Sequence, residues 1–149
     1  MLFRSDLAVI DNFQRLILTV EAKKKFGATE KWAADLRQNF VVNGFYPIST
    51  YFLLATPEKF FLWTKENNTF EETMPDFVAD ATETLQPYLD ELGFNIKKIE
   101  GRTFQNVVAQ WLKYGVIYSF DKENLPKWLI KSKLAEKIAK GRLLLETVV

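Results

Sequence analysis

The chain has no histidine and no cysteine among its 149 residues. These absences exclude Ser-His-Asp and Cys-His nucleophilic catalysis, zinc sites built from His or Cys, and haem ligation by either residue. Any metal must therefore be held by oxygen ligands, which favours magnesium, manganese or calcium. Without cysteine no disulfide can form, which fits a reducing compartment, so we expect a cytoplasmic protein.

Long apolar runs and a strong net charge are also missing. No stretch approaches the roughly 20 apolar residues of a membrane helix, and the charged start, MLFRSDLAVID, lacks the layout of a signal peptide. We therefore expect no membrane partner. The net charge of +1 provides no global basic field, so a nucleic-acid surface would have to be a local patch. The remaining composition, 48% hydrophobic and 26% charged, is typical of one globular domain.

Apolar patterning predicts a hairpin, a helix and a second hairpin within residues 1–65. The helix has Thr29 as its expected N-cap and an apolar stripe of Trp32, Leu36 and Phe40, which Ala33 could extend. The expected elements are strands at 2–11 and 15–23, a helix at 27–44, and strands at 49–56 and 59–65.

The C-terminal region, residues 77–149, is predicted to be helical. Helices are expected at about 78–92, kinked or split at Pro87, at 103–115 and at 125–140. The acidic, turn-rich stretch 66–76 is expected to be a connection. The predicted fold class is α/β (α+β), with a mixed sheet of about four strands flanked by helices, in a single domain spanning 1–149.

Three charged residues near the first hairpin form the strongest candidate site. Side chains alternate along a strand, so Glu21 and Lys23 share one face of the second strand. A register that pairs residues whose numbers sum to 27 would place Asp6 opposite Glu21 on that face. Two adjacent carboxylates repel each other, and a divalent cation would relieve this repulsion. The arrangement therefore predicts a metal-dependent site for phosphodiester hydrolysis.

The segment RSDLAVIDNFQRLILTVEAKKK resembles the core motif of the PD-(D/E)xK nuclease superfamily. Within it, the segment is most similar to the N-terminal nuclease-like domains of type I restriction enzyme R subunits. Ser5-Asp6 stands in the Pro-Asp place, and Glu21-Ala22-Lys23 stands in the Glu-x-Lys place. Gln38 matches a glutamine of the following helix, and YFLLATPEKFFLW resembles the next two strands. The similarity covers about residues 3–65.

This resemblance implies a restriction-endonuclease-like domain that hydrolyses DNA in a bacterial restriction-modification setting. Mg²⁺ or Mn²⁺ would be held by Asp6, Glu21 and the backbone carbonyl of Ala22. Lys23 would position or activate the attacking water, and Gln38 would assist from the helix. DNA is the implied partner, together with a homodimer or a larger restriction or repair assembly.

The chain departs from the family pattern before Asp6. Ser5 replaces the family's proline, and the family fold begins with a helix, often carrying a Glu, and a strand upstream of the aspartate. Here only five residues precede Asp6. We expect either that an N-terminal part is missing or that C-terminal helices cover that sheet face.

Two other interpretations stay open at this stage. The domain could be a catalytically inactive nuclease-like fold that binds nucleic acid or protein. It could also be a structural or oligomerisation domain, in which an open sheet edge near residues 2–11 pairs with a partner chain.

Other charged and aromatic groups carry weaker expectations. Asp11 is expected to cap the hairpin turn, and a run of aromatic residues is expected to pack in the core rather than to stack on bases. An acidic group lacks the spacing of a calcium loop, and a basic amphipathic C-terminal segment is expected to be a solvated helix. The aromatic run is Phe60, Phe61 and Trp63; the acidic group is Glu71, Glu72, Asp76 and Asp80; the basic segment carries Lys127, Lys131, Lys133, Lys137, Lys140 and Arg142.

Overall fold

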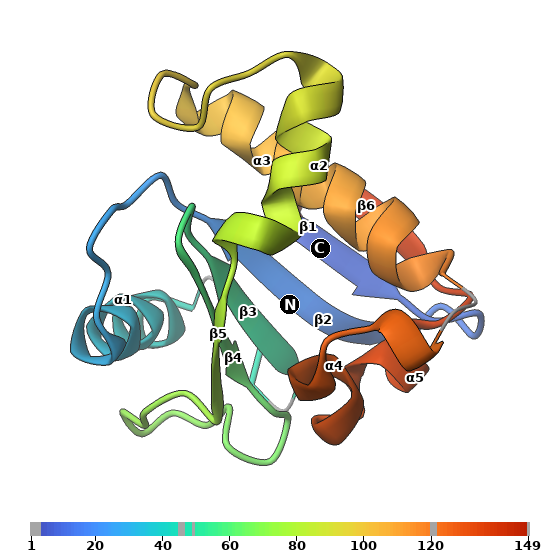
Figure 1. Ribbon diagram of the computed structural model, residues 1–149. Helices are drawn as coiled ribbons and strands as arrows, with labels where there is room; N and C mark the ends of the chain where they lie inside the picture. Colours follow the sequence, from blue (N-terminus) through green and yellow to red (C-terminus); the bar gives the residue numbers. More distant parts are fainter. Residues whose placement is uncertain (1–3, 45–46, 49, 120–121, 149) are drawn as a thin grey trace.

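A six-stranded mixed sheet forms the centre of the protein (Figure 1). The computed structural model describes residues 4–44, 47–48, 50–119 and 122–148, so the predicted strand positions 2, 3 and 49 lie outside the described residues. The strand order is β5-β4-β3-β2-β1-β6, and only β2 and β3 are parallel. The strands are β1 (Arg4–Ile10), β2 (Leu16–Ala22), β3 (Tyr51–Ala55), β4 (Lys59–Trp63), β5 (Phe77–Asp80) and β6 (Arg142–Val148).

The predicted mixed α/β class is confirmed, whereas the predicted count of about four strands is wrong. The two additional strands, β5 and β6, both come from the region expected to be helical. β5 pairs with β4, and β6 pairs with β1. β5 and β6 supply backbone hydrogen-bond partners to β4 and β1, whose edges would otherwise be unpaired. This pairing outweighs the weak local preference of the two segments for another secondary structure.

The first hairpin has the predicted register. Leu7 pairs with Val20, and Ala8 pairs with Thr19, so paired numbers sum to 27 over this stretch. The register shifts between Val9 and Ile10 near the turn. The second hairpin, β3 and β4, is antiparallel as predicted. Between the hairpins, α1 (Glu30–Val42) connects β2 to the parallel strand β3.

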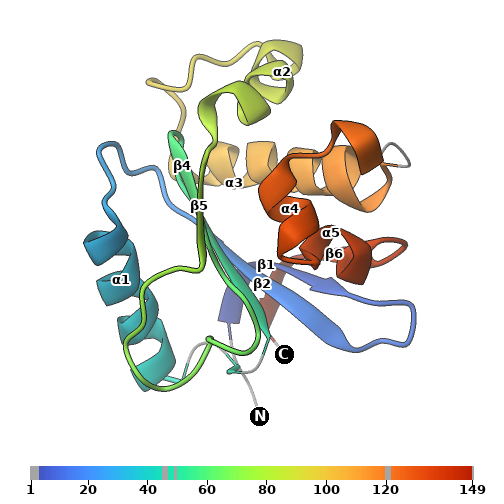
Figure 2. The same cartoon turned by 60° about the horizontal axis from the view of Figure 1, so that its bottom comes forward.

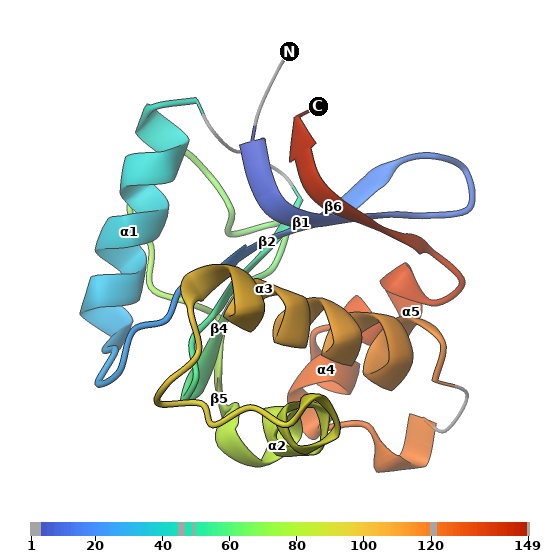
Figure 3. The same cartoon turned by 90° about the horizontal axis from the view of Figure 1, so that it is seen from above.

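The two faces of the sheet are covered differently. Helices from the C-terminal region pack on one face, against Leu7, Val20, Leu53 and Leu62 among others (Figures 1 and 3). The other face carries α1 alone among the described helices, packed against Phe52, Leu54, Phe61 and Trp63 (Figure 2). Because side chains alternate along each strand, Asp6 and Glu21 lie on the α1 face.

Helix α1 packs on the sheet through the predicted stripe and also through a more deeply buried row beside it. Its Thr29 N-cap is confirmed, since the hydroxyl accepts a hydrogen bond from the Trp32 amide. The predicted stripe residues Trp32, Leu36 and Phe40 are half-buried against the sheet cluster. The fully buried residues of the helix are Ala33, Ala34, Arg37 and Val41, of which only Ala33 was expected to belong to the stripe. Small alanines let the helix approach a sheet surface already filled by large aromatic side chains.

The connection from β4 to β5 is held down by a buried cation. The Arg37 guanidinium donates hydrogen bonds to Asn68 Oδ1 and to the Glu71 and Thr69 carbonyls. Asn68 in turn donates to the Thr50 carbonyl at 2.9 Å. This network fixes residues 68–71 against α1 and so determines what the outer flank of that helix contacts.

The C-terminal region contains helices and the two strands already described, so its description as a helical half is not confirmed. α2 (Thr82–Leu92) runs through Pro87 without splitting. α3 (Gly101–Gln110) continues into the π-helical segment η1 (Trp111–Ile117). A short 3-10 turn, η2 (Lys122–Asn124), follows.

The predicted helix 125–140 is divided into α4 (Lys127–Lys131) and α5 (Leu134–Ile138). Lys133 has a φ of 65° at the break, and the Ser132 hydroxyl accepts a hydrogen bond from the Leu134 amide. Serine competes with the helix backbone in this way, which explains the division. Within the described ranges, no helix has both the length and the apolar character needed to cross a membrane.

Candidate metal and catalytic site

The open end of the first hairpin brings two carboxyl groups together on the α1 face. Asp6 lies on β1 and Glu21 on β2, one pair beyond Leu7–Val20 in the same register. Glu21 is only 5% exposed, and Asp6 is half-buried. The Ala22 amide donates a hydrogen bond to Asp6 Oδ2 at 3.0 Å, which fixes the Asp6 carboxyl against the end of β2. The predicted proximity of the two acidic residues is therefore present in the structure.

The electrostatics of Asp6 are unfavourable to its ionised form. Burial and the negative charge of Glu21 raise the pKa of Asp6 to about 6 from an ordinary value of 3.8. A hydrogen bond between the two carboxyl groups adds to this rise, whereas the Ala22 amide and Lys23 oppose it. The two side chains thus hold a proton between them more readily than isolated carboxylates would. A cation placed there would remove the same repulsion.

Lys23 completes a three-residue charged group. Its Nζ lies 2.8 Å from Glu21 Oε1, and its side chain is 40% exposed, compared with 7% for Glu21. The ammonium also lies 5.7 Å from the centre of the Phe40 ring on α1. Lys23 therefore reaches solvent while its charge stays beside the buried carboxylate.

Gln38 is directed elsewhere. Its Nε2 donates a hydrogen bond to the Phe70 carbonyl at 2.8 Å, in the connection that Arg37 anchors. Phe40, two residues later on α1, is the helix residue that meets Lys23. Residues two apart on a helix are rotated by roughly 200°, so Gln38 faces the flank away from Lys23. The structure brings together Asp6, Glu21 and Lys23 but not Gln38.

Sequence reasoning did not assign two further neighbours of this site. Thr19 lies on β2 two residues before Glu21, on the same face, and it is fully buried. Its hydroxyl has no hydrogen-bond partner among the described residues. Phe40 was expected only to pack in the core. The alternation along β2 contained the signal for Thr19, whereas the position of Phe40 depends on the rotation of α1.

The oxygen ligands that the structure offers a metal here are limited in number. No group of three or more acidic residues able to hold a metal occurs in the described part of the chain. The two adjacent carboxyl groups of Asp6 and Glu21 nevertheless suit a hard divalent cation, which prefers carboxylate oxygens and retains waters at its other positions. The Ala22 carbonyl as a third ligand stays a prediction.

The other candidates are accounted for by local structure. Asp11 caps the turn as predicted, since Oδ1 accepts hydrogen bonds from the Phe13 and Arg15 amides and Oδ2 contacts Arg15 Nε at 2.8 Å. Phe60, Phe61 and Trp63 are fully buried, which confirms their expected role in the core. Asp76 accepts hydrogen bonds within the β4–β5 connection.

The oligomerisation hypothesis loses its main premise. The edge near residues 2–11 was expected to be open, but β6 pairs with β1 from Arg4 to Ile10. The C-terminal part of the chain thus supplies both the strand beside β1 and the helices on one sheet face.

The fold and site together define a mixed α/β protein with a carboxylate pair and a lysine at the open end of a buried hairpin. No family model, curated protein or solved structure matches the chain.

Proposed function

We propose that this protein is a Mg²⁺-dependent or Mn²⁺-dependent hydrolase of DNA phosphodiester bonds, built as a restriction-endonuclease-like nuclease domain. The observation that carries the proposal is the close placement of Asp6 and Glu21, with the Lys23 ammonium 2.8 Å from Glu21. An arrangement that raises the pKa of one carboxyl to about 6 opposes stability at neutral pH. Such arrangements are common at functional sites.

In this proposal, Asp6 and Glu21 hold the divalent cation. When bound, the cation would supply positive charge to the phosphate and ease ionisation of a bound water. Lys23 donates a hydrogen bond to the attacking water or to a phosphate oxygen, and its charge stabilises the negative charge of the transition state. Water adds to phosphorus, the bond to one ester oxygen breaks, and the water's proton is passed to the departing alkoxide.

The exposed lysines after the site support a polyanionic substrate. Lys24 and Lys25 follow Lys23 and are both exposed. Lys25 lies 5.9 Å from the Trp32 ring centre on α1, which places its charge on the same side of the helix as Phe40. Lysines in this position can contact successive phosphates of a nucleic-acid backbone.

The test combines metal binding with DNA cleavage. Titration with Mn²⁺ is expected to raise the melting temperature of the wild-type protein but not that of Asp6→Asn or Glu21→Gln. Supercoiled plasmid with Mg²⁺ should be cut by the wild type and by neither variant. Glu91→Gln, which neutralises an exposed carboxylate on α2, is the matched control and should behave like the wild type. Absence of both the metal response and cleavage in the wild type would overturn the proposal.

A non-catalytic nuclease-like module that binds nucleic acid or protein is the second candidate. It is favoured by the small size of the acidic group at the site, because no third acidic residue joins Asp6 and Glu21 there among the described residues. This alternative predicts retention of DNA without cleavage, weakened strongly by added salt and unchanged in Lys23→Ala.

A further inference from the structure

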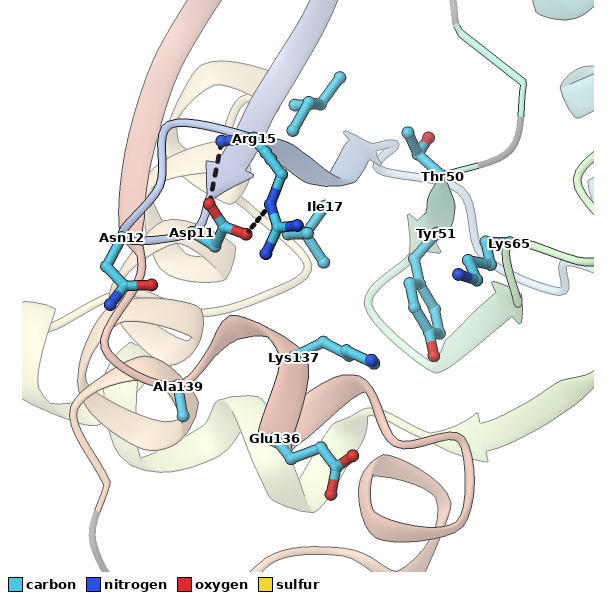
Figure 4. Close-up of a pocket in the computed structure, with 11 residues that line it drawn as sticks. Asp11, Asn12, Arg15, Ile17, Thr50, Tyr51, Lys65, Glu136, Lys137 and Ala139 are labelled. Carbon is cyan, nitrogen blue, oxygen red and sulfur yellow. Dashed lines mark hydrogen bonds and ion pairs between the residues drawn. The ribbon is translucent and has the colours of Figure 1, made fainter.

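A second charged site lies at the opposite end of β2 from Glu21. A cavity of about 400 Å³ is bounded by the hairpin turn, the start of β3 and α5 (Figure 4). Its lining includes Ile17, four residues before Glu21, so about 13 Å of strand separates the two sites. The cavity volume falls in the range of small-molecule sites, which is roughly 300–1,000 Å³.

Three cationic side chains from separate parts of the chain line this cavity. They are Arg15 from the hairpin, Lys65 from the turn that follows β4 and Lys137 from α5. Lys65 and Lys137 point toward each other beside Tyr51 in Figure 4. Within the described ranges, neither lysine makes an ion pair with a carboxylate. Glu66 and Glu136 lie close enough to raise the pKa of the Tyr51 hydroxyl, but in the described structure neither makes direct contact with the two ammonium groups, which stay accessible to a ligand.

The Arg15 guanidinium is oriented by Asp11. Arg15 Nε contacts Asp11 Oδ2 at 2.8 Å, as the dashed line in Figure 4 shows. The two terminal nitrogens of Arg15 make no hydrogen bond to the described residues. Asp11 is occupied by this contact and by two backbone amides, so it fixes the arginine without closing the terminal nitrogens to a ligand.

The backbone of α5, which carries Lys137, is attached to the sheet through the α4–α5 junction. The Tyr51 hydroxyl donates a hydrogen bond to the Ser132 carbonyl at 2.7 Å. Tyr51 is itself 6% exposed and belongs to the buried core. The start of α5 is thereby attached to β3, which holds the helix at the cavity.

We propose that this cavity binds an organic phosphate monoester of about the size of a mononucleotide. The two lysines, which have no ion pair within the described residues, and the Asp11-paired arginine suit a phosphate, which carries up to two negative charges and several acceptor oxygens. Leu16, Ile17 and Tyr51 provide apolar surface for the organic part of the ligand. Glu136 also lines the cavity, and its charge acts on the Tyr51 hydroxyl, but it forms no ion pair with Lys137 in the part of the chain that the structure describes. The site is independent of the proposed nuclease function.

Calorimetric titration of the full chain with adenosine 5′-monophosphate, ribose 5-phosphate and adenosine tests this assignment. At least one of the two phosphate esters should bind, and adenosine should bind at least tenfold more weakly or not at all. The double variant Lys65→Ala/Lys137→Ala should weaken binding of the phosphate ester by roughly tenfold or more. Lys97→Ala/Lys98→Ala, which removes two exposed lysine charges from the α2–α3 loop, is the charge-matched control and should stay within twofold of the wild type.

Two results would overturn the assignment: absence of binding by both phosphate esters, or binding that the double variant leaves unchanged. Amide NMR spectra of the double variant test whether it is folded. A separate single variant, Arg15→Gln, should also weaken binding of the phosphate ester. Asp6→Asn should retain the affinity, so failure of this site and failure of the nuclease proposal give different results. Competition by single-stranded DNA with higher affinity than the monoesters would also contradict the assignment.

Discussion

The β1–β2 hairpin places an aspartate near each of its ends, and the two residues have opposite environments. At the turn, Asp11 accepts hydrogen bonds from two amides and contacts the Arg15 guanidinium. Partial burial opposes ionisation of Asp11, but these contacts with Arg15 and Phe13 prevail and lower its pKa. At the open end, Asp6 has one amide donor and faces Glu21, and its pKa rises to about 6.

In its ionised form, Asp11 stabilises the fold, whereas the ionised form of Asp6 destabilises it. Both residues lie on or next to the same strand, so strand propensity does not distinguish them. The difference is in the partners: complementary donors surround Asp11, whereas a like charge faces Asp6. Conflict of this kind within an otherwise consistent structure is typical of a functional position.

The largest effect is expected from Lys23→Ala on DNA cleavage. Under the proposed function, loss of the ammonium beside Glu21 should lower the cleavage rate by roughly 100-fold or more, because a charge that stabilises the transition state is removed. Single-turnover cleavage at saturating Mg²⁺ measures this rate. An unchanged melting temperature would confirm that the fold is intact. A rate within threefold of the wild type would remove Lys23 from the site.

A smaller effect, on stability, is expected from Asp11→Ala. This change leaves the Phe13 and Arg15 amides without their acceptor and should lower the melting temperature by roughly 3–6 °C. Thermal unfolding at pH 7 provides the measurement. An unaltered melting temperature would show that water replaces the carboxylate fully. Asp11 would then not stabilise the fold, and the contrast with Asp6 would be lost.

Asp6→Asn should shift the melting temperature in the opposite direction. At pH 8 and without divalent metal, the change removes the charge that faces Glu21, while the asparagine oxygen can still accept from the Ala22 amide. A rise of roughly 2–4 °C is expected. Asp6→Ala serves as the comparison, because it removes both the charge and the acceptor. A fall in melting temperature for Asp6→Asn would contradict the repulsion.

The same residue predicts a pH dependence of stability. The folded state holds the Asp6 proton up to about pH 6, whereas the unfolded chain releases it near pH 4. The contribution of Asp6 to stability is therefore present below pH 4 and is lost as the pH rises to 6. Urea unfolding measures the free energy of unfolding of the wild type and of Asp6→Asn from pH 4 to pH 8. The difference between the two proteins should change between about pH 4 and pH 6. Added Mn²⁺ should stabilise the wild type more at pH 8 than at pH 5. A difference in unfolding free energy between wild type and Asp6→Asn that stays constant from pH 4 to pH 8 would refute the raised pKa of Asp6.

Asp11 should show the reverse slope. Its pKa is lowered in the folded state, so its contribution is present above the unfolded pKa and is lost as the pH falls through the lower folded value. Asp11→Asn should therefore remove stability at pH 7 and little of it in strong acid.

Local sequence patterns were sufficient for the hairpin, its register and the pairing of Asp6 with Glu21. Alternation with period two determines which residues share a face, and the short turn leaves few registers. The same reasoning identified Thr29 and Asp11, whose hydrogen bonds reach only two to four residues along the chain.

Features set by distant contacts could not be predicted in this way. β5 and β6 exist because β4 and β1 offer unpaired backbone, and β6 is more than 130 residues away from its partner. The cavity beside Arg15 joins three segments that no local pattern connects. The rotation of α1 depends on Arg37 reaching the carbonyls of Thr69 and Glu71, so the direction of Gln38 could not be inferred from its place in the sequence.

Gln38→Ala carries the smallest expected effect. Its amide donates to the Phe70 carbonyl on the flank of α1 that faces away from Lys23. Under the proposed function, the cleavage rate should therefore fall by less than about threefold, with a slight loss of stability from one exposed hydrogen bond. Phe40→Leu is the informative comparison, because it removes the ring that contacts Lys23 while keeping an apolar side chain, and it should lower the rate more than Gln38→Ala does. A larger loss of cleavage rate in Gln38→Ala than in Phe40→Leu would contradict this expectation. It would mean that Gln38, rather than Phe40, faces the substrate during the reaction, as the family resemblance implies.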